Sequence, residues 1–179
     1  MYNLRAKFNA QLLRNCSGKI VSWLDFCQHI DNHGFGVSIA KSPGWYATDL
    51  YMLKVVFHSR MKRYRCLVSD PGRADSFFIP YYIGLDALHF LYGNEWVRAT
   101  HHGAELVSWL EKKAKWSCKR RGGIDHFMVT GRTTWDLSRA PIEKGTNWGT
   151  SLLELPAMAN VTTLLVESQT WMDREQAIG

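Results

Sequence analysis

Residues 124–139, IDHFMVTGRTTWDLSR, contain a short apolar run with ionisable groups on both sides. The apolar run, residues 127–130, has the length and composition of a buried β-strand. Asp125 and His126 precede it, and Arg132 follows it directly after a glycine. Because α/β proteins usually place their chemistry at strand ends, we expect a functional site at this strand.

Length and composition favour one domain over residues 1–179, since 46% of these residues are hydrophobic and can form a core. The net charge of +6 favours polyanionic or phosphate-bearing partners without identifying one. Six of the ten residues 112–121 are basic, which we interpret as a solvated helix end followed by a loop. Since no nucleic-acid recognition motif accompanies them, no nucleic-acid partner is expected.

The four cysteines contain no CxxC pair, which disfavours a zinc site. Cys16 and Cys27 are close enough in sequence to clip one loop in an oxidising compartment. Asn15 and Asn160 each begin an N-glycosylation acceptor pattern. Together these features favour the secretory lumen.

Membrane and metal sites find little support in the sequence. No apolar run approaches the ~18 residues of a membrane span, and the N-terminus lacks a signal-like apolar region. A lumenal protein would therefore carry its targeting segment outside this chain. The histidine pairs 29/33 and 101/102 have no HExxH pattern and no acidic partner at ligand spacing, so we expect no metal.

Hydrophobic periodicity and turn residues predict helices over residues 10–15, 48–62, 84–91 and 103–115. Asn9 and Thr48 are the expected caps of the first two helices. The second helix should bury one apolar face, made of Leu50, Leu53, Val56, Phe57 and Met61. Residues 16–44 are predicted to be irregular, because Gly34, Gly36 and the pair Pro43-Gly44 interrupt them.

Strands are predicted over residues 75–82, 126–130 and 161–167. Helices separate these strands along the chain. This rhythm predicts an α/β fold, a Rossmann-like three-layer sandwich with a mostly parallel sheet.

Several short motifs occur in the order seen in one family of enzymes. They are Lys7-Phe8-Asn9, Asn32-x-Gly34-Phe35-Gly36, Trp45-Tyr46-x-Thr48, Phe57-His58-x-Arg60-Met61, Phe78-Ile79-Pro80-Tyr81-Tyr82-x-Gly84-Leu85-Asp86, Asp125-His126-Phe127, Gly131-Arg132-x-x-Trp135-Asp136 and Leu165-x-x-Glu167. In this order the chain resembles the exostosin-type glycosyltransferases, and most closely the plant xyloglucan galactosyltransferase branch.

The resemblance implies an inverting transferase, anchored in the Golgi membrane as a type II protein with its domains on the lumenal face. Such an enzyme moves galactose or a related sugar from a UDP-sugar to a xyloglucan-like wall polysaccharide, alongside other Golgi glycosyltransferases. The family has the GT-B arrangement of two Rossmann-like domains. The chain resembles the N-terminal, acceptor-side domain, without the anchor and without the C-terminal domain that holds the UDP-sugar. No cofactor is therefore expected on this chain, and by itself it should be inactive.

One position departs from the family pattern. Ile124 stands where the family usually carries an arginine before Asp-His-Phe. The neighbouring carboxylate of Asp125 therefore lacks the fixed charge and the donors of a guanidinium group.

Inverting transfer requires a base that takes the proton from the acceptor hydroxyl. Our candidates are Asp125, His126 and Asp136, and His126 is attractive because its ordinary pKa lies near neutrality. The structural alternative makes His126 a buried link between strand and loop, and Asp136 a loop or helix cap.

Further residues are candidates for substrate binding. Asp86 is expected at the end of the preceding strand. Arg132 could face the donor phosphates or pair with Asp136, and the pairing is favoured. Tyr82, Trp135 and Trp148 could stack on sugar rings, although core packing is the favoured role of each.

Two other functions stay open from the sequence. The chain could be a non-catalytic lumenal module that binds glycans or proteins, derived from a truncated gene copy. A basic nucleic-acid binder that uses residues 112–121 ranks last.

Overall fold

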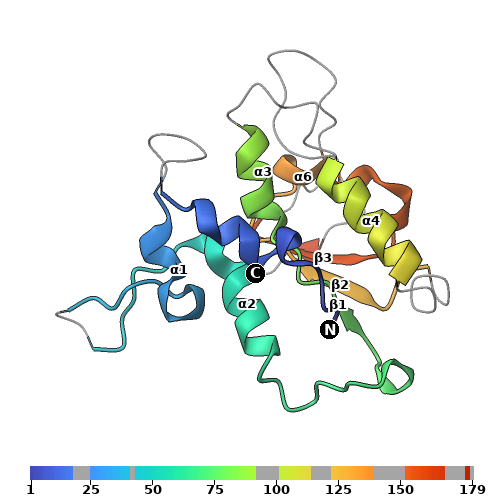
Figure 1. Cartoon of the computed structure of the whole chain (residues 1–179), viewed down its shortest axis with the longest axis horizontal. Coiled ribbons are helices and arrows are strands. Elements are labelled where there is room, and N and C mark those ends of the chain that lie inside the picture. Colours follow the sequence, from blue (N-terminus) through green and yellow to red (C-terminus); the bar gives the residue numbers. More distant parts are fainter. Residues whose placement is uncertain are drawn as a thin grey trace.

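The computed structural model describes residues 1–17, 25–40, 43–91, 101–113, 122–138, 152–167 and 176–177. Its parallel strands are β1 (Phe77–Phe78), β2 (His126–Val129) and β3 (Thr162–Leu165), and a short β4 (Gln176–Ala177) pairs with β3 at one edge. The register places Phe127 of β2 between Phe78 and Thr162. The predicted α/β fold with a parallel sheet is therefore confirmed (Figure 1).

The α-helices are α1 (Cys27–Gly34), α2 (Leu53–Met61), α3 (Ile83–Leu91), α4 (His101–Lys113) and α6 (Trp135–Ser138). Short 3-10 helices occupy Ala6–Phe8, Ala10–Asn15, Leu50–Met52, Pro71–Arg73, Leu152–Glu154 and Pro156–Met158. Within the described ranges, no helix has the length and apolar character needed to cross a membrane.

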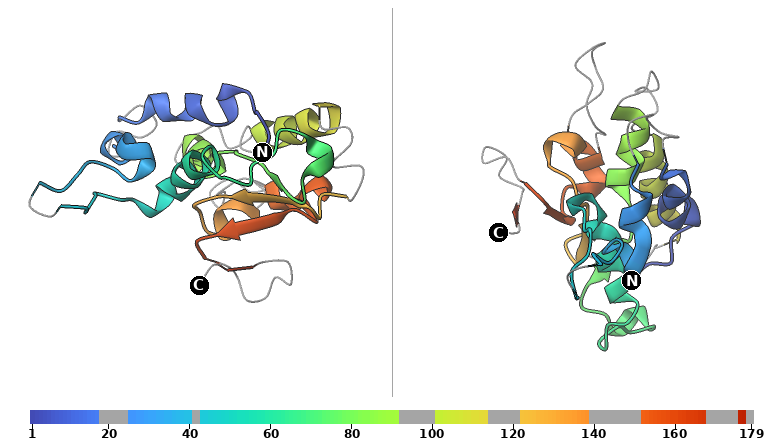
Figure 2. Two further views of the ribbon diagram at one scale, coloured as in Figure 1. Left: turned by 90° about the horizontal axis from the view of Figure 1, so that it is seen from below. Right: turned by 90° about the vertical axis from the view of Figure 1, so that its left-hand side faces the viewer.

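Helices cover both faces of the sheet. On one face, the Phe57 ring of α2 lies 5.1 Å from the ring of Phe78 and 6.1 Å from that of Phe127. On the other face, Leu106 and Leu110 of α4 pack in one core with Met128. Figure 1 shows the sheet between α2 and α4, and Figure 2 shows the same ribbon from two further sides. This double coverage explains why β2 reads as an almost continuous apolar run.

The N-terminal segment is part of this core. Leu4 and Phe8 are buried with the residues of α4 and β2, and the Tyr2 amide donates to the carbonyl of Phe78 at 3.0 Å. The side-chain oxygen of Asn9 accepts from the amide of Ala10 at 2.6 Å. The predicted Asn9 cap is thus confirmed, on a helix of the 3-10 type.

The structure corrects the prediction that residues 16–44 are irregular, because α1 lies within them. Asn32 and His33 inside α1 have positive φ angles of 51° and 64°. Such a kinked helix carries no regular apolar period, so the breaker glycines dominated the sequence pattern. Cys16 and Cys27 form a disulfide, which confirms the predicted pair and fixes the start of α1.

The helix predicted over residues 48–62 begins later than expected. Asp49, rather than Thr48, caps the first turn, since its carboxylate accepts from the Tyr51 amide at 2.7 Å. The Thr48 hydroxyl instead donates to the carbonyl of Phe35 at 2.8 Å.

The predicted buried face of this helix is only partly right, because Phe57 packs on the sheet but other members of the face do not. Met52, Lys54, Val55 and His58 are buried, whereas Leu50 and Leu53 are exposed. Apolar residues occur all round the helix, so their spacing does not select one face.

The first strand is shorter than the predicted residues 75–82. The Ile79 amide still donates to the Phe127 carbonyl at 2.9 Å, but farther along the chain the Tyr82 amide donates to the carbonyl of Phe8 at 2.8 Å. Ile79, Tyr81 and Tyr82 are still buried. The apolar run in residues 75–82 therefore indicated burial and did not indicate where strand pairing ends.

Some sequence features lie outside the described residues. They are Trp148, Cys118 and the part of the basic stretch after residue 113.

A buried histidine joins α2 to the segment after β1. His58 Nδ1 lies 2.9 Å from the Tyr82 hydroxyl. Burial lowers the pKa of His58 to about 4, and the positive charge of Lys62 adds to this effect. Burial also raises the pKa of Tyr82 to about 12. Both side chains are therefore neutral at neutral pH.

We predict that acid destabilises the fold through His58. Its ordinary pKa of 6.5 in the unfolded chain exceeds the folded value of about 4, so between these values the unfolded state binds the extra proton. The free energy of unfolding should fall as the pH drops from 6.5 to 4, by at most about 1.4 kcal/mol per unit. Urea unfolding at several pH values measures this slope. His58→Gln should flatten it, and an unchanged slope in that variant would contradict the assignment.

Candidate functional site

The carboxyl end of β2 makes a tight turn against the helix that precedes α2. Gly131 adopts a positive φ of 59°, and a Cβ there would lie 3.3 Å from the carbonyl oxygen of Tyr51. The Thr130 amide donates to the Leu164 carbonyl at 3.1 Å, which holds the turn to β3. The loop after β2 is thus fixed at the edge of the sheet where parallel α/β proteins usually bind ligands.

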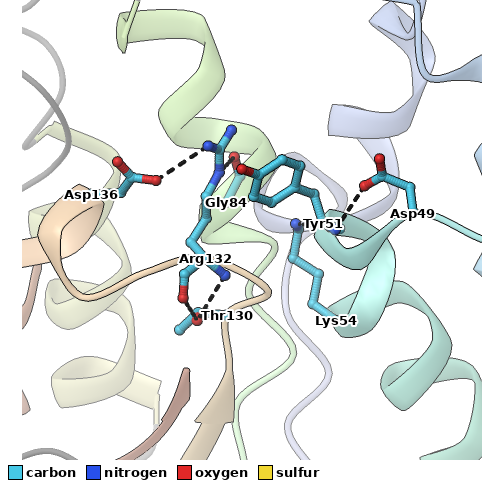
Figure 3. A network of polar contacts seen from close by, with 7 residues as sticks. All are labelled: Asp49, Tyr51, Lys54, Gly84, Thr130, Arg132 and Asp136. Atoms are coloured by element: carbon cyan, nitrogen blue, oxygen red, sulfur yellow. Dashed lines mark hydrogen bonds and ion pairs between the residues drawn. The ribbon is translucent and has the colours of Figure 1, made fainter. Parts of the chain in front are cut away.

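Arg132 connects four elements at this edge (Figure 3). Its Nη1 donates to Asp136 Oδ2 on α6 at 3.2 Å, and its Nε donates to the Gly84 carbonyl on α3 at 3.3 Å. Its guanidinium carbon lies 4.2 Å from the ring centroid of Tyr51. The Arg132–Asp136 pair favoured from the sequence is therefore present. In the part of the chain that the structure describes, Nη2 is buried without a hydrogen-bond partner.

Lys54 brings a second buried cation to this cluster. It is 1% exposed, and its Nζ donates to the carbonyl of Tyr51. Burial lowers the pKa of Lys54 well below 10.5, the charge of Arg132 lowers it further, and Asp49 opposes the shift. No sequence pattern indicated that Lys54 would be buried, because a lysine within an amphipathic helix is normally solvated.

Asp86 forms a second polar group, in the first turn of α3. It is buried and accepts from the Tyr81 hydroxyl. Its Oδ1 lies 2.7 Å from Nδ1 of His102, on the first turn of α4. The hydrogen bond to Asp86 raises the pKa of His102, although burial opposes it. About a third of the His102 side chain is exposed, so this imidazole combines a buried carboxylate partner with access to solvent.

The Asp125–His126 pair lies at the opposite end of β2. His126 Nδ1 is 2.8 Å from Asp125 Oδ1, and Nε2 is 2.7 Å from the Tyr2 hydroxyl. The His126 ring stacks on Phe77 with centroids 5.0 Å apart. Burial lowers the pKa of His126, and Asp125 partly offsets this effect. This geometry matches the structural alternative, a buried histidine that ties strand to loop.

The two ends of β2 cannot share one substrate atom. A strand rises about 3.3 Å per residue, so the Cα atoms of His126 and Thr130 lie about 13 Å apart. The structure therefore does not bring His126 and Asp125 together with Arg132 and Asp136. Catalytic roles for Asp125, His126 and Asp136 stay predictions.

The remaining candidates differ in exposure. Tyr82 is buried against His58, in agreement with core packing. Trp135 is 42% exposed at the start of α6, which leaves ring surface open to a ligand. Ile124, at the position where the family pattern has an arginine, is exposed. The Asp125 carboxylate pairs with His126.

Other predicted positions lie away from this edge. Asn160 is exposed, and its side-chain Nδ2 donates to the carbonyl of Gly122 at 3.1 Å. Asn15 is the last residue of a 3-10 helix. Glycosylation of either residue stays a prediction. Among the described residues, no group of three His, Cys, Asp or Glu side chains could hold a metal ion.

Comparison with known proteins gives consistent matches. The chain matches the Exostosin GT47 domain over residues 1–178. It is 40% identical over 177 residues to "Xyloglucan galactosyltransferase MUR3" of Arabidopsis thaliana, an alignment that covers 96% of this chain and 28% of that protein. It is 37% identical over 176 residues to "Probable xyloglucan galactosyltransferase GT19" of the same plant, covering 98% of this chain and 40% of that protein.

A third relative is named for a different activity. The chain is 38% identical over 182 residues to "Xyloglucan-specific galacturonosyltransferase 1" of Arabidopsis thaliana, covering 99% of this chain and 26% of that protein. The chain thus spans well under half the length of each of these three relatives. No solved structure matches it.

We predict that Gly84→Ala destabilises the protein although alanine favours helices by about 1 kcal/mol over glycine. A Cβ at Gly84 would lie 2.7 Å from Arg132 Cγ, 2.8 Å from Lys54 Nζ and 2.9 Å from the Thr130 carbonyl oxygen. Since a backbone atom is among these contacts, the free energy of unfolding should fall by about 1–3 kcal/mol. Urea unfolding measures this loss.

Gly72→Ala is the matched control. A Cβ at Gly72 would meet only the Asp70 side chain, at 3.4 Å or more, so its effect should stay within about 0.5 kcal/mol. Equal stabilities of the two variants would show that the Arg132–Lys54 cluster tolerates displacement.

Proposed function

Since this chain belongs to the exostosin GT47 family of glycosyltransferases, we propose that it forms the acceptor-side domain of a GT-B enzyme. The enzyme would transfer galactose or a related sugar from a UDP-sugar to xyloglucan with inversion. Its closely similar relatives carry xyloglucan in their names. The observation that carries the proposal is the cluster of ionisable groups at the carboxyl edge of the sheet.

The proposed reaction needs one proton transfer from the acceptor. The base takes the proton of the acceptor hydroxyl while that oxygen forms a bond to the anomeric carbon of the donor. The bond from this carbon to the phosphate oxygen breaks, and UDP leaves with the electron pair. The donor would lie on a second domain, so this chain would supply the base and the acceptor-binding surface.

His102, oriented by Asp86, is our preferred base. A base must reach the acceptor, and His102 combines exposure with a fixed Nδ1 partner. Asp136 is held by Arg132, and His126 lies at the far end of β2. The carboxylate of Glu167, exposed beyond the end of β3, is a further candidate that the sequence motif contains.

The proposed compartment is the Golgi lumen. The Cys16–Cys27 disulfide is consistent with an oxidising compartment, and the acceptor patterns at Asn15 and Asn160 fit the same location. Other Golgi glycosyltransferases are proposed partners.

A chimera tests the transferase function. This chain replaces the matching segment of the Arabidopsis xyloglucan galactosyltransferase MUR3, to which it is 40% identical. We expect the chimera to transfer galactose from UDP-galactose to xyloglucan oligosaccharides, and the chain alone to show no transfer. UDP-galacturonate serves as the competing donor, because one relative is named a galacturonosyltransferase.

Turnover by the isolated chain would contradict the two-domain proposal. A correctly folded chimera without transfer, together with glycan binding by the chain alone, would instead favour a non-catalytic lumenal module.

The pH dependence of the chimera tests the base. His102 must be neutral to accept a proton, and its pKa is raised above 6.5 by Asp86. We therefore expect kcat/KM to fall as the pH drops through a value above 6.5, and Asp86→Asn to move this limb to lower pH. His102→Gln should reduce kcat by about 100-fold or more.

Four further variants separate the alternatives. Each of them removes one of the other candidate bases: Asp125→Asn, His126→Gln, Asp136→Asn and Glu167→Gln. If one of these variants loses the fall of kcat/KM at low pH while His102→Gln retains activity, the residue substituted in that variant is the base and His102 is not.

A further inference from the structure

A hollow in the surface lies away from the carboxyl edge of the sheet, between α1, the segment 43–48 and α2. It has a volume of about 770 Å³. The rings of Phe35, Trp45 and Tyr46 line it together with the cationic side chains of Arg60 and Arg63. Among the described residues, its lining contains no carboxylate.

The two arginines lack carboxylate partners in the described part of the chain. The Arg60 guanidinium lies over the Phe35 ring, 5.6 Å from its centroid. Arg63 Nη2 is 3.4 Å from Nε2 of His33, which is no source of negative charge. Proximity to the end of α2 accounts for cations in this region through the helix dipole. It does not account for the aromatic rings that share the same hollow.

The aromatic side chains are unusually open to solvent. Trp45 is 69% exposed and Tyr46 is 39% exposed, and the Tyr46 ring lies 6.0 Å from that of Phe35. Large exposed rings grouped in a concave surface indicate a ligand. The CH groups on one face of a pyranose ring form an apolar surface that suits such rings.

The backbone of the hollow is held in place before any ligand binds. Asn32 has a positive φ of 51°, and its side-chain Nδ2 donates to the Gly36 carbonyl at 2.8 Å. A Cβ at Gly36 would lie 2.2 Å from the carbonyl oxygen of Ala47, so only glycine fits between the two segments. A wall fixed in this way reduces the entropy that binding would cost.

We propose that this hollow, the Trp45 pocket, binds an oligosaccharide that carries a carboxylate, that is, a glycan containing uronate. The aromatic rings supply a surface on which sugar rings can stack. The side chains of Asn32, Thr48 and Ser59 in the lining supply hydrogen-bond partners for sugar hydroxyls. The guanidinium groups of the two arginines can each bind a carboxylate through two parallel hydrogen bonds. The inference goes beyond the transfer reaction, because it assigns a separate binding site that needs no donor domain.

Calorimetry on the full chain tests the proposal with three ligands. They are trigalacturonate, its methyl ester and neutral cellotriose. We expect trigalacturonate to bind about tenfold more tightly than the ester, because the ester keeps the sugar rings and loses the charge. Cellotriose should bind no better than the ester.

Variants locate the binding in the pocket. Trp45→Ala and Arg60→Gln should each weaken trigalacturonate binding by about tenfold. Lys62→Gln is the matched control, since Lys62 is an exposed cation on the same helix end that does not line the hollow. Its effect should stay within about twofold. Circular dichroism confirms that each variant is folded.

Several results would overturn the proposal. They are equal affinities for the acid and its ester, equal effects of Arg60→Gln and Lys62→Gln, and absence of binding at millimolar ligand. Tighter binding of UDP than of trigalacturonate would show that the pocket binds a nucleotide. An affinity for inorganic phosphate equal to that for trigalacturonate would show a general anion site. Either outcome would exclude a uronate-containing glycan as the specific ligand. Failure of the chimeric transferase leaves this test unaffected, because binding is measured on the chain itself.

Discussion

A buried guanidinium group organises the carboxyl edge of this protein. Arg132 is 5% exposed, yet it reaches a carboxylate on α6, a carbonyl on α3 and the ring of Tyr51. Burial of a charge is costly unless its partners compensate, so these elements must hold their relative positions. The close approach of α3 depends on the missing side chain of Gly84, and the turn depends on Gly131. Two glycines and one arginine therefore determine where the sheet edge and its helices meet.

The order of β1, β2 and β3 and of the helices α2, α3 and α4 could be predicted from the sequence, because apolar runs indicate burial directly, whereas α1 and α6 were not predicted. The ends of the elements could not. The run that includes Phe77 and Tyr82 is buried throughout, but only Phe77–Phe78 pairs with β2. In α2, the apolar residues surround the helix, so Lys54 was the buried residue that no pattern indicated.

In the candidate site, too, some contacts could be predicted from the sequence and others could not. The Arg132–Asp136 pair was favoured from the sequence because the donor nucleotide was expected mainly on another domain, and the structure contains this pair. The contact between Asp86 and His102 joins residues on different helices, so no sequence spacing predicts it. Asp125 and His126 precede the predicted strand and lie at its amino end, and the length of β2 separates them from Arg132 and Asp136 at the carboxyl end.

The Tyr2–His126 hydrogen bond has a consequence for biosynthesis. It joins residues 124 positions apart, so the N-terminal segment cannot reach its final place until most of the chain has been made. Contacts of this span slow folding, because a long loop must close before they stabilise anything. The Cys16–Cys27 disulfide spans only 11 positions and can form while the sheet is still incomplete. Early formation of this disulfide followed by late closure of the sheet leaves an interval in which the nascent chain is already cross-linked but has not yet completed its core.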